Sequence, residues 1–141
     1  MNHIPDNLLE GWEILVVDDE PDSLEVASVI LDAYGAKVHE AGDGAEALAL
    51  MKRARPMLVI SDLSMPVMDG WRFLSAIRDD ADLMYTPVIA LTAHAMPGDA
   101  QRALEAGFNN YLTKPLTVET FMENLVLVLM QIPMLAEHIN I

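Results

Sequence analysis

Residues 57–62, MLVISD, begin with a short apolar run, Met57–Ile60, and an acidic side chain, Asp62, follows that run. Similar short runs recur along the chain, and amphipathic segments separate them. The other runs are Ile14–Val17, Lys37–His39, Val88–Leu91 and Tyr111–Leu112. Runs rich in Val, Ile and Leu without polar alternation are typical of parallel strands that are covered on both faces. We therefore expect five strands, most of them buried.

The segments between these runs have the spacing of amphipathic helices. The first of them begins at Pro21, which suits the first turn of a helix, and stops before Gly35, which suits a left-handed end. The next begins with Asp43 and Glu46 in the pattern of a capping box. Further helices are expected at residues 71–78 and 99–106, and Thr117 is the expected N-cap of the last one.

Strands that alternate with helices predict an α/β doubly wound fold, with a five-stranded parallel sheet and helices on both faces. In such sheets the functional side chains lie just beyond the carboxyl ends of the strands. Polar residues stand at these positions here: Asp18 and Asp19 follow the first run, Asp62 the third, Thr92 the fourth and Lys114 the fifth. The sequence therefore predicts one polar site at that edge.

The chemistry of this set favours phosphoryl transfer. Carboxylates that lie close together repel one another and need a cation. Oxygen ligands with open positions suit Mg²⁺, which binds through one or two carboxylates and a phosphate. Asp62 can then act as a nucleophile, while Lys114 and Thr92 supply a positive charge and a hydrogen bond to phosphoryl oxygens.

Four strings carry a resemblance to a known family: ILVVDDE, VISDLSMPVMDGW, ALTAHA and YLTKPL. In order and spacing they resemble the receiver domain of two-component response regulators, over residues 13–131. The resemblance implies a flavodoxin-like (βα)5 fold with strand order 2-1-3-4-5. Residues 1–12 are then an N-terminal extension, and residues 132–141 are a C-terminal tail.

The resemblance also implies a role for each site residue. Asp62 is the phosphoacceptor and takes its phosphoryl group from a phosphohistidine on a sensor histidine kinase or a histidine phosphotransfer protein. Asp19 is expected to bind Mg²⁺ (or Mn²⁺) directly, and Asp18 through water. Asp62 itself and the backbone carbonyl of Ser64 complete the metal site.

The remaining residues serve a two-state switch. Lys114 binds the phosphoryl group and precedes Pro115 in a bond that is often cis in this family. Thr92 is the switch hydroxyl and Tyr111 the switch aromatic, and Ala93 keeps the phosphoryl approach open. Phosphorylation is expected to change the surface of the fourth helix, fifth strand and fifth helix for a downstream protein target.

On the sequence alone, each of these residues could instead have a purely structural role. Asp19 is also a reasonable helix cap, and Thr92 a strand-end hydroxyl bonded to local backbone. Lys114 can be a solvated lysine near a turn, and Tyr111 a core aromatic.

Other function classes stay open as well, with evidence against them. A phosphohydrolase with an aspartyl nucleophile usually has a second Asp two residues later, where this chain has Ser64. A flavodoxin-like cofactor binder would need a Ser/Thr/Gly-rich loop in place of DDEP. A receiver that never takes phosphate would not keep the whole set, so we expect a phosphoacceptor and not a turnover enzyme.

The composition restricts the number of domains, the location of the protein and its possible partners. The 141 residues suit one domain without an output domain, and 52% of them are hydrophobic, enough for a core. There is no cysteine, which fits a cytoplasmic protein, and no apolar run long enough for a membrane span. The net charge of −14 disfavours nucleic acid and anionic membranes as partners. The last helix is apolar on nearly every side, so either the C-terminal tail covers it or it forms a homodimer or partner interface.

Overall fold

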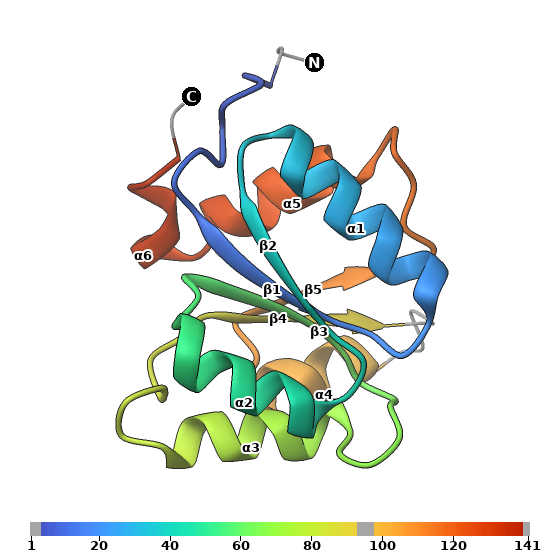
Figure 1. Ribbon diagram of the computed structural model, residues 1–141, viewed down its shortest axis with the longest axis vertical. Helices are drawn as coiled ribbons and strands as arrows, with labels where there is room; N and C mark the ends of the chain where they lie inside the picture. The colour runs from blue at the N-terminus through green and yellow to red at the C-terminus, as the bar shows by residue number, and fades with distance from the viewer. Residues whose placement is uncertain (1–3, 93–97, 140–141) are drawn as a thin grey trace.

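Five parallel strands form one sheet in the computed structural model, which describes residues 4–92 and 98–139 (Figure 1). The strand order is β2-β1-β3-β4-β5, as the family resemblance implied. The bounds are β1 Glu13–Val17, β2 Lys37–Ala41, β3 Leu58–Asp62, β4 Val88–Thr92 and β5 Asn110–Thr113. Every residue of β3 and β4 is buried, because both faces of these central strands are covered by helices.

The helices lie on both faces of this sheet (Figure 1). They are α1 Pro21–Ala33, α2 Gly44–Ala54, α3 Gly70–Asp79, α4 Asp99–Ala106, α5 Phe121–Met130 and α6 Pro133–Ala136. One core cluster joins the sheet to α1 and α5, and a second joins it to α2, α3 and α4. Successive side chains of β1 alternate between the two: Ile14 enters the first cluster and Leu15 the second.

The ends of the helices follow local chemistry. The side chain of Asp43 accepts a hydrogen bond from the Glu46 amide at 2.9 Å, as a capping box requires. The returning bond differs from the expected pattern, because the Glu46 carboxylate accepts from the amide of Gly42 at 2.7 Å. Gly35 has a φ of 100° just after α1, where a side chain would be strained.

The predicted start of the last helix is wrong. Thr117 is not its N-cap: α5 begins at Phe121, and Thr120 holds the N-cap position. Residues 118–120 form a turn instead, in which the carbonyl of Thr117 accepts a hydrogen bond from the Phe121 amide at 2.9 Å. Thr120 makes no side-chain capping bond, so the start of α5 depends on packing of its apolar residues.

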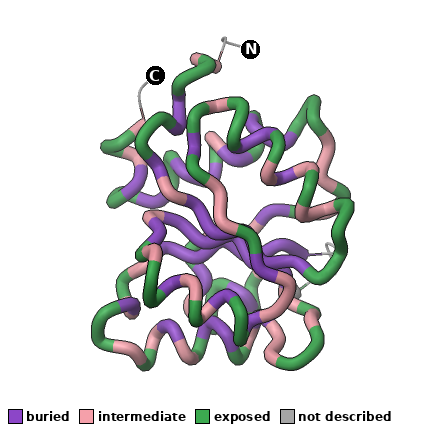
Figure 2. Tube along the Cα trace, viewed as in Figure 1, coloured by how far each residue is buried: buried purple, intermediate pink, exposed green. Residues whose placement is uncertain are grey.

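Both terminal segments contribute to the core on the α1 and α5 side. Leu8, Leu9 and Trp12 are buried, and the Leu9 amide donates to the carbonyl of Tyr34 at 2.9 Å. Figure 2 shows buried stretches in these terminal segments. The segments expected as an extension, residues 1–12, and as a tail, residues 132–141, therefore pack with the helices of the domain as far as the structure describes them.

The tail covers part of the apolar last helix. Ile132 and Leu135 are buried against it, in the same core cluster as Leu125. Leu127 and Met130 stay exposed, with 63% and 53% of their surface accessible. Within residues 4–92 and 98–139, none of the helices has the length and apolar character needed to cross a membrane.

Candidate functional site

The carboxyl ends of β1, β3, β4 and β5 place four predicted site residues at one edge of the sheet. Asp62 is the last residue of β3 and Thr92 the last of β4, and both are buried. Asp18 follows β1 directly and Lys114 follows β5. The strands are parallel and in register, with Asp62 opposite Leu91, so their ends meet at the same edge.

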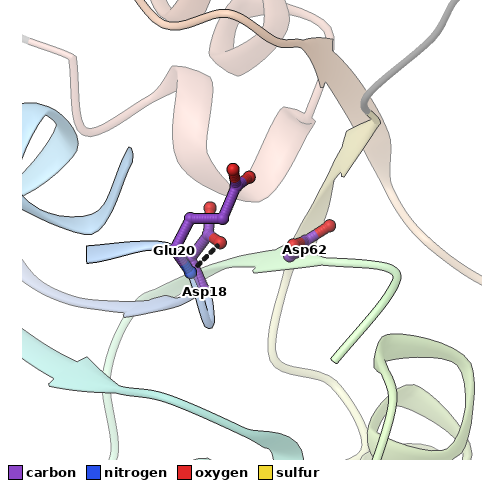
Figure 3. A group of neighbouring side chains, drawn as sticks. All are labelled: Asp18, Glu20 and Asp62. Atoms are coloured by element: carbon purple, nitrogen blue, oxygen red, sulfur yellow. Dashed lines mark hydrogen bonds between the residues drawn. The ribbon is translucent and has the colours of Figure 1, made fainter. Parts of the chain in front are cut away.

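Three carboxylates cluster at this edge, those of Asp18, Glu20 and Asp62 (Figure 3). One oxygen from each lies within 4.8 Å of one from each of the others. Asp18 and Asp62 are buried, whereas Glu20 is exposed at the rim. The Glu20 amide donates to Asp18 Oδ1 at 2.9 Å, which fixes the backbone between the two acids.

Lys114 lies between these carboxylates. Its Nζ is 2.6 Å from Glu20 Oε1, 2.9 Å from Asp18 Oδ2 and 3.2 Å from Asp62 Oδ2. Burial alone would lower the pKa of Lys114, but the hydrogen bonds to Glu20 and Asp18 and the charges of Asp18 and Asp62 raise it well above its usual range. Lys114 is therefore a fixed positive charge in the site.

Burial raises the pKa of Asp62, and the neighbouring charge of Asp18 raises it further. The charge of Lys114 and the backbone amide of Ser64 offset part of this effect. Asp62 Oδ1 accepts hydrogen bonds from the amides of Leu63 at 2.7 Å and Ser64 at 3.3 Å. Its other oxygen, Oδ2, faces Lys114, so the carboxylate has one anchored oxygen and one oxygen turned toward the cluster.

The remaining predicted site residues differ in how close they lie to the carboxylate cluster. Asp19 is exposed and does not belong to the carboxylate cluster, so its direct coordination of a metal stays a prediction. Tyr111 is half-buried and packs against the core on the α2, α3 and α4 side. The bond between Lys114 and Pro115 is cis, as expected. Ala93 lies outside the described residues.

Glu20 is a site residue that the sequence analysis missed. Its signal was present, because ILVVDDE carries a third acid directly before Pro21. An acid next to the first turn of a helix also interacts favourably with the helix dipole, so the presence of Glu20 could be explained without a role in a functional site. The contact with Lys114 depends on the direction of a long side chain, which sequence spacing does not determine.

The cluster fits a divalent metal ion. Asp18, Glu20 and Asp62 offer the carboxylate oxygens that Mg²⁺ and Mn²⁺ prefer. Asp18 Oδ2 is buried, and within the described residues its partner is the Lys114 ammonium at 2.9 Å, so this oxygen already faces a cation. These residues can therefore hold a metal ion at the edge of the sheet.

The family model of the response regulator receiver domain matches residues 14–126 of this chain. Among curated relatives, an uncharacterised 14.6 kDa protein of Leptolyngbya boryana is 45% identical over 107 residues, covering 76% of this chain and 82% of the relative. The polar-differentiation response regulator DivK of Brucella anthropi is 32% identical over 112 residues, covering 79% of this chain and 91% of the relative.

Solved structures with the same fold include the chemotaxis response regulator CheY4 of Vibrio cholerae. It is 36% identical, with a TM-score of 0.77, and the match covers 84% of this chain and 98% of that one. The receiver domain of sensor histidine kinase PA1611 from Pseudomonas aeruginosa is also 36% identical, with a TM-score of 0.72 and coverage of 82% and 94%. That structure holds a magnesium ion in its active site cleft.

Proposed function

The chain belongs to the response regulator receiver domain family, and from that premise we propose that Asp62 is its phosphoacceptor in two-component signal transduction. The observation that carries the proposal is the Asp62 carboxylate, buried at the end of β3 with Oδ2 turned toward Lys114. The donor is a phosphohistidine on a sensor histidine kinase or a histidine phosphotransfer protein.

The reaction is a displacement at phosphorus. Asp62 Oδ2 attacks the phosphorus atom, the new P–O bond forms, and the P–N bond of the phosphohistidine breaks with its electron pair going to the imidazole nitrogen. Asp62 Oδ1 keeps its bonds to the amides of Leu63 and Ser64, which hold the carboxylate in one orientation. Such positioning is a large part of catalysis in phosphoryl transfer.

Mg²⁺ or Mn²⁺, when bound, supplies positive charge that offsets the carboxylates and the incoming phosphoryl group. Asp18 and Asp62 are the residues whose place in the cluster best supports binding of the ion. The magnesium ion in the Pseudomonas aeruginosa receiver domain supports the same assignment by analogy. The expected contributions of Asp19 and the Ser64 carbonyl are part of this proposal.

Lys114 and Thr92 complete the phosphoryl site. The Lys114 ammonium pairs with one phosphoryl oxygen, and the hydroxyl of Thr92, at the adjacent end of β4, donates to another. Movement of Thr92 toward the phosphoryl group lets Tyr111 turn inward from β5. The surface of α4, β5 and α5 then changes for a downstream protein target.

The signal is carried by protein contacts, in the cytoplasm. Ser64 stands where a phosphohydrolase of this kind would have its second acid, so the phosphoryl group persists and the chain is not a turnover enzyme. A homodimer through the last helix is a further part of the proposal, since Leu127 and Met130 stay exposed beside the tail.

Intact mass tests the chemistry. The wild type and the Asp62→Asn variant are incubated with acetyl phosphate and either Mg²⁺ or EDTA. We expect a gain of one phosphoryl mass in the wild type with Mg²⁺ and in no other sample. Absence of the adduct in the wild type, together with no binding of beryllofluoride, would rule out Asp62 as a phosphoacceptor.

A further inference from the structure

We propose that Glu20 is a positioning residue that competes with phosphoryl oxygens for the Lys114 ammonium, and that it thereby weakens the affinity of the site for anionic phosphoryl donors. The inference rests on the proposed function of Asp62. Glu20 belongs to the carboxylate cluster that can hold a metal ion, but it has no assigned part in the transfer of the phosphoryl group. The proposal predicts a site that improves when this carboxylate is removed.

The Glu20 carboxylate is in direct contact with the Lys114 ammonium. Glu20 Oε1 lies 2.6 Å from Lys114 Nζ, the shortest of the three ion pairs that Lys114 makes. The Lys114 side chain is 8% exposed and the Glu20 side chain is 62% exposed. Glu20 is therefore the carboxylate that lies between the buried ammonium and the solvent from which a donor arrives.

Within residues 4–92 and 98–139, the Glu20 side chain makes no hydrogen bond or ion pair except the one to Lys114. Glu20 occupies the N-cap position of α1, but its side chain makes no capping hydrogen bond. Its backbone amide donates a hydrogen bond to Asp18 Oδ1. N-cap side chains ordinarily bond the first amides of the helix. The Glu20 carboxylate turns toward Lys114 instead, so its direction is not explained by the helix.

Lys114 already has as many carboxylate partners within the described residues as it has N–H bonds. A lysine ammonium has three N–H bonds, and Lys114 already has three carboxylates within ion-pair distance. A phosphoryl oxygen that binds Lys114 must displace one of them. Exposed ion pairs contribute little because water and salt screen them, whereas Asp18 and Asp62 are buried. Glu20 is therefore the partner that a phosphoryl oxygen displaces.

The test uses two substitutions of Glu20 at saturating Mg²⁺. Glu20→Gln removes the charge and keeps the shape. Glu20→Asp keeps the charge but shortens the reach, and aspartate at an N-cap tends to bond the helix amides, which turns it away from Lys114. We expect the half-saturating acetyl phosphate concentration to fall about five-fold in Glu20→Gln, the effect of one exposed ion pair.

Glu20→Asp separates contact from charge. If the contact with Lys114 matters, Glu20→Asp also lowers the half-saturating concentration. If Glu20→Asp behaves as the wild type while Glu20→Gln does not, only long-range charge is involved and the proposal is overturned. Glu25→Gln is the matched control, since Glu25 is an exposed α1 carboxylate that pairs with none of the described residues. It should leave the half-saturating concentration unchanged.

A second readout needs neither donor nor metal. The ¹⁵N signal of the Lys114 ammonium is followed by NMR in EDTA. Loss of the Glu20 hydrogen bond should shift this signal and speed its hydrogen exchange in both Glu20 variants, and Glu25→Gln should not. An unchanged Lys114 signal in both variants would overturn the contact. Failure of the wild type to form a phosphoryl adduct would instead overturn the proposed function, so the two failures are distinguishable.

Discussion

Gly70 lies against the carbonyl oxygen of Asp62 with no room for a side chain between them. A Cβ atom at Gly70 would be 2.2 Å from that oxygen, well inside any van der Waals contact. The amide of Gly70 also donates to the carbonyl of Leu63 at 3.0 Å. The first residue of α3 is thus fixed against the end of β3, and this contact positions the proposed phosphoacceptor.

Gly70→Ala should therefore damage both stability and the site. Because the clashing atom is backbone, the loop from β3 to α3 has to shift, and we expect a loss of about 2–4 kcal/mol in the free energy of unfolding. Urea denaturation measures this loss, and the phosphoryl mass adduct should form more slowly. Gly42→Ala is the control, since its nearest atom would be 3.8 Å away in ordinary contact. Equal stability of the two variants would contradict the packing argument.

Asp62→Asn should stabilise the metal-free chain at neutral pH. Burial and the charge of Asp18 raise the pKa of Asp62, although Lys114 and Ser64 offset part of the rise. A carboxyl whose folded pKa lies above its unfolded value destabilises the fold at pH values above the folded pKa, because its charged form is disfavoured there. We expect a gain of roughly 1 kcal/mol in the free energy of unfolding of Asp62→Asn at pH 7 in EDTA.

The gain in the free energy of unfolding of Asp62→Asn should shrink as the pH falls. As pH falls below the unfolded pKa of an aspartate, about 3.9, Asp62 is protonated in both states and the difference from Asp62→Asn should vanish. Thermal unfolding of both proteins across pH 3–8 measures this difference in the free energy of unfolding. Saturating Mg²⁺ should remove the gain, because the ion favours the charged form of Asp62. A gain that grew toward acid pH would contradict the raised pKa.

Arg78 should matter for stability and not for phosphorylation. Its guanidinium donates to the carbonyls of Met84, Thr86 and Gly107 and to Asn109 Oδ1, at distances from 2.7 to 3.1 Å. It therefore links the end of α3 to the turns that precede β4 and β5, at the opposite edge of the sheet from Asp62. Burial lowers the pKa of Arg78, but arginine stays charged at neutral pH.

Arg78→Met should cost about 2–4 kcal/mol in the free energy of unfolding, since it leaves several carbonyls without a donor. Arg78→Lys should recover little of this, because an ammonium cannot reproduce the planar fork. Arg72→Met on the exposed side of the same helix is the control and should change stability by less than about 0.5 kcal/mol. Loss of the phosphoryl adduct in folded Arg78→Met would contradict a purely structural role.

Much of the fold and of the site was predictable because the relevant signals are local. A polar residue that ends an apolar run is easily identified, which is why Asp18, Asp62 and Lys114 were found and do lie together. The five strands were found in the same way, and α4 was predicted with its observed bounds. The parallel sheet then brings the strand ends together without further information.

The rest depends on contacts between residues far apart in the sequence. Thr117 and Thr120 are equally suitable caps by type, and the packing of α5 decides between them. Leu9 and Trp12 belong to a segment without helical or strand periodicity, so their burial was not visible in the pattern. Glu20 was missed because a side-chain direction, and not a spacing, brings it to Lys114.

Leu9→Ala should destabilise the chain although Leu9 precedes the first strand. Its side chain is fully buried in the core cluster of α1 and α5, and its amide bonds to the Tyr34 carbonyl. A buried Leu→Ala change costs about 2–5 kcal/mol, from lost burial and the cavity left behind. Urea denaturation measures the effect, and Leu127→Ala, exposed on α5, should cost less than about 0.5 kcal/mol. Equal costs would show that the segment before β1 does not pack as described.

Leu127→Glu should weaken self-association without unfolding the chain. Leu127 and Met130 lie one helical turn apart on α5, both more than half exposed, and Met134 on α6 is 48% exposed nearby in sequence. Exposed apolar side chains of this kind favour an interface, and a charge placed among them must be desolvated when two copies meet. Sedimentation velocity at increasing protein concentration should show a dimer in the wild type and a shift toward monomer in Leu127→Glu. Glu123→Gln, an exposed change on the same helix, is the control for charge. A wild type that stays monomeric at every concentration would remove the homodimer from the proposal and leave this strip for the downstream target, while the Asp62 chemistry would be unaffected.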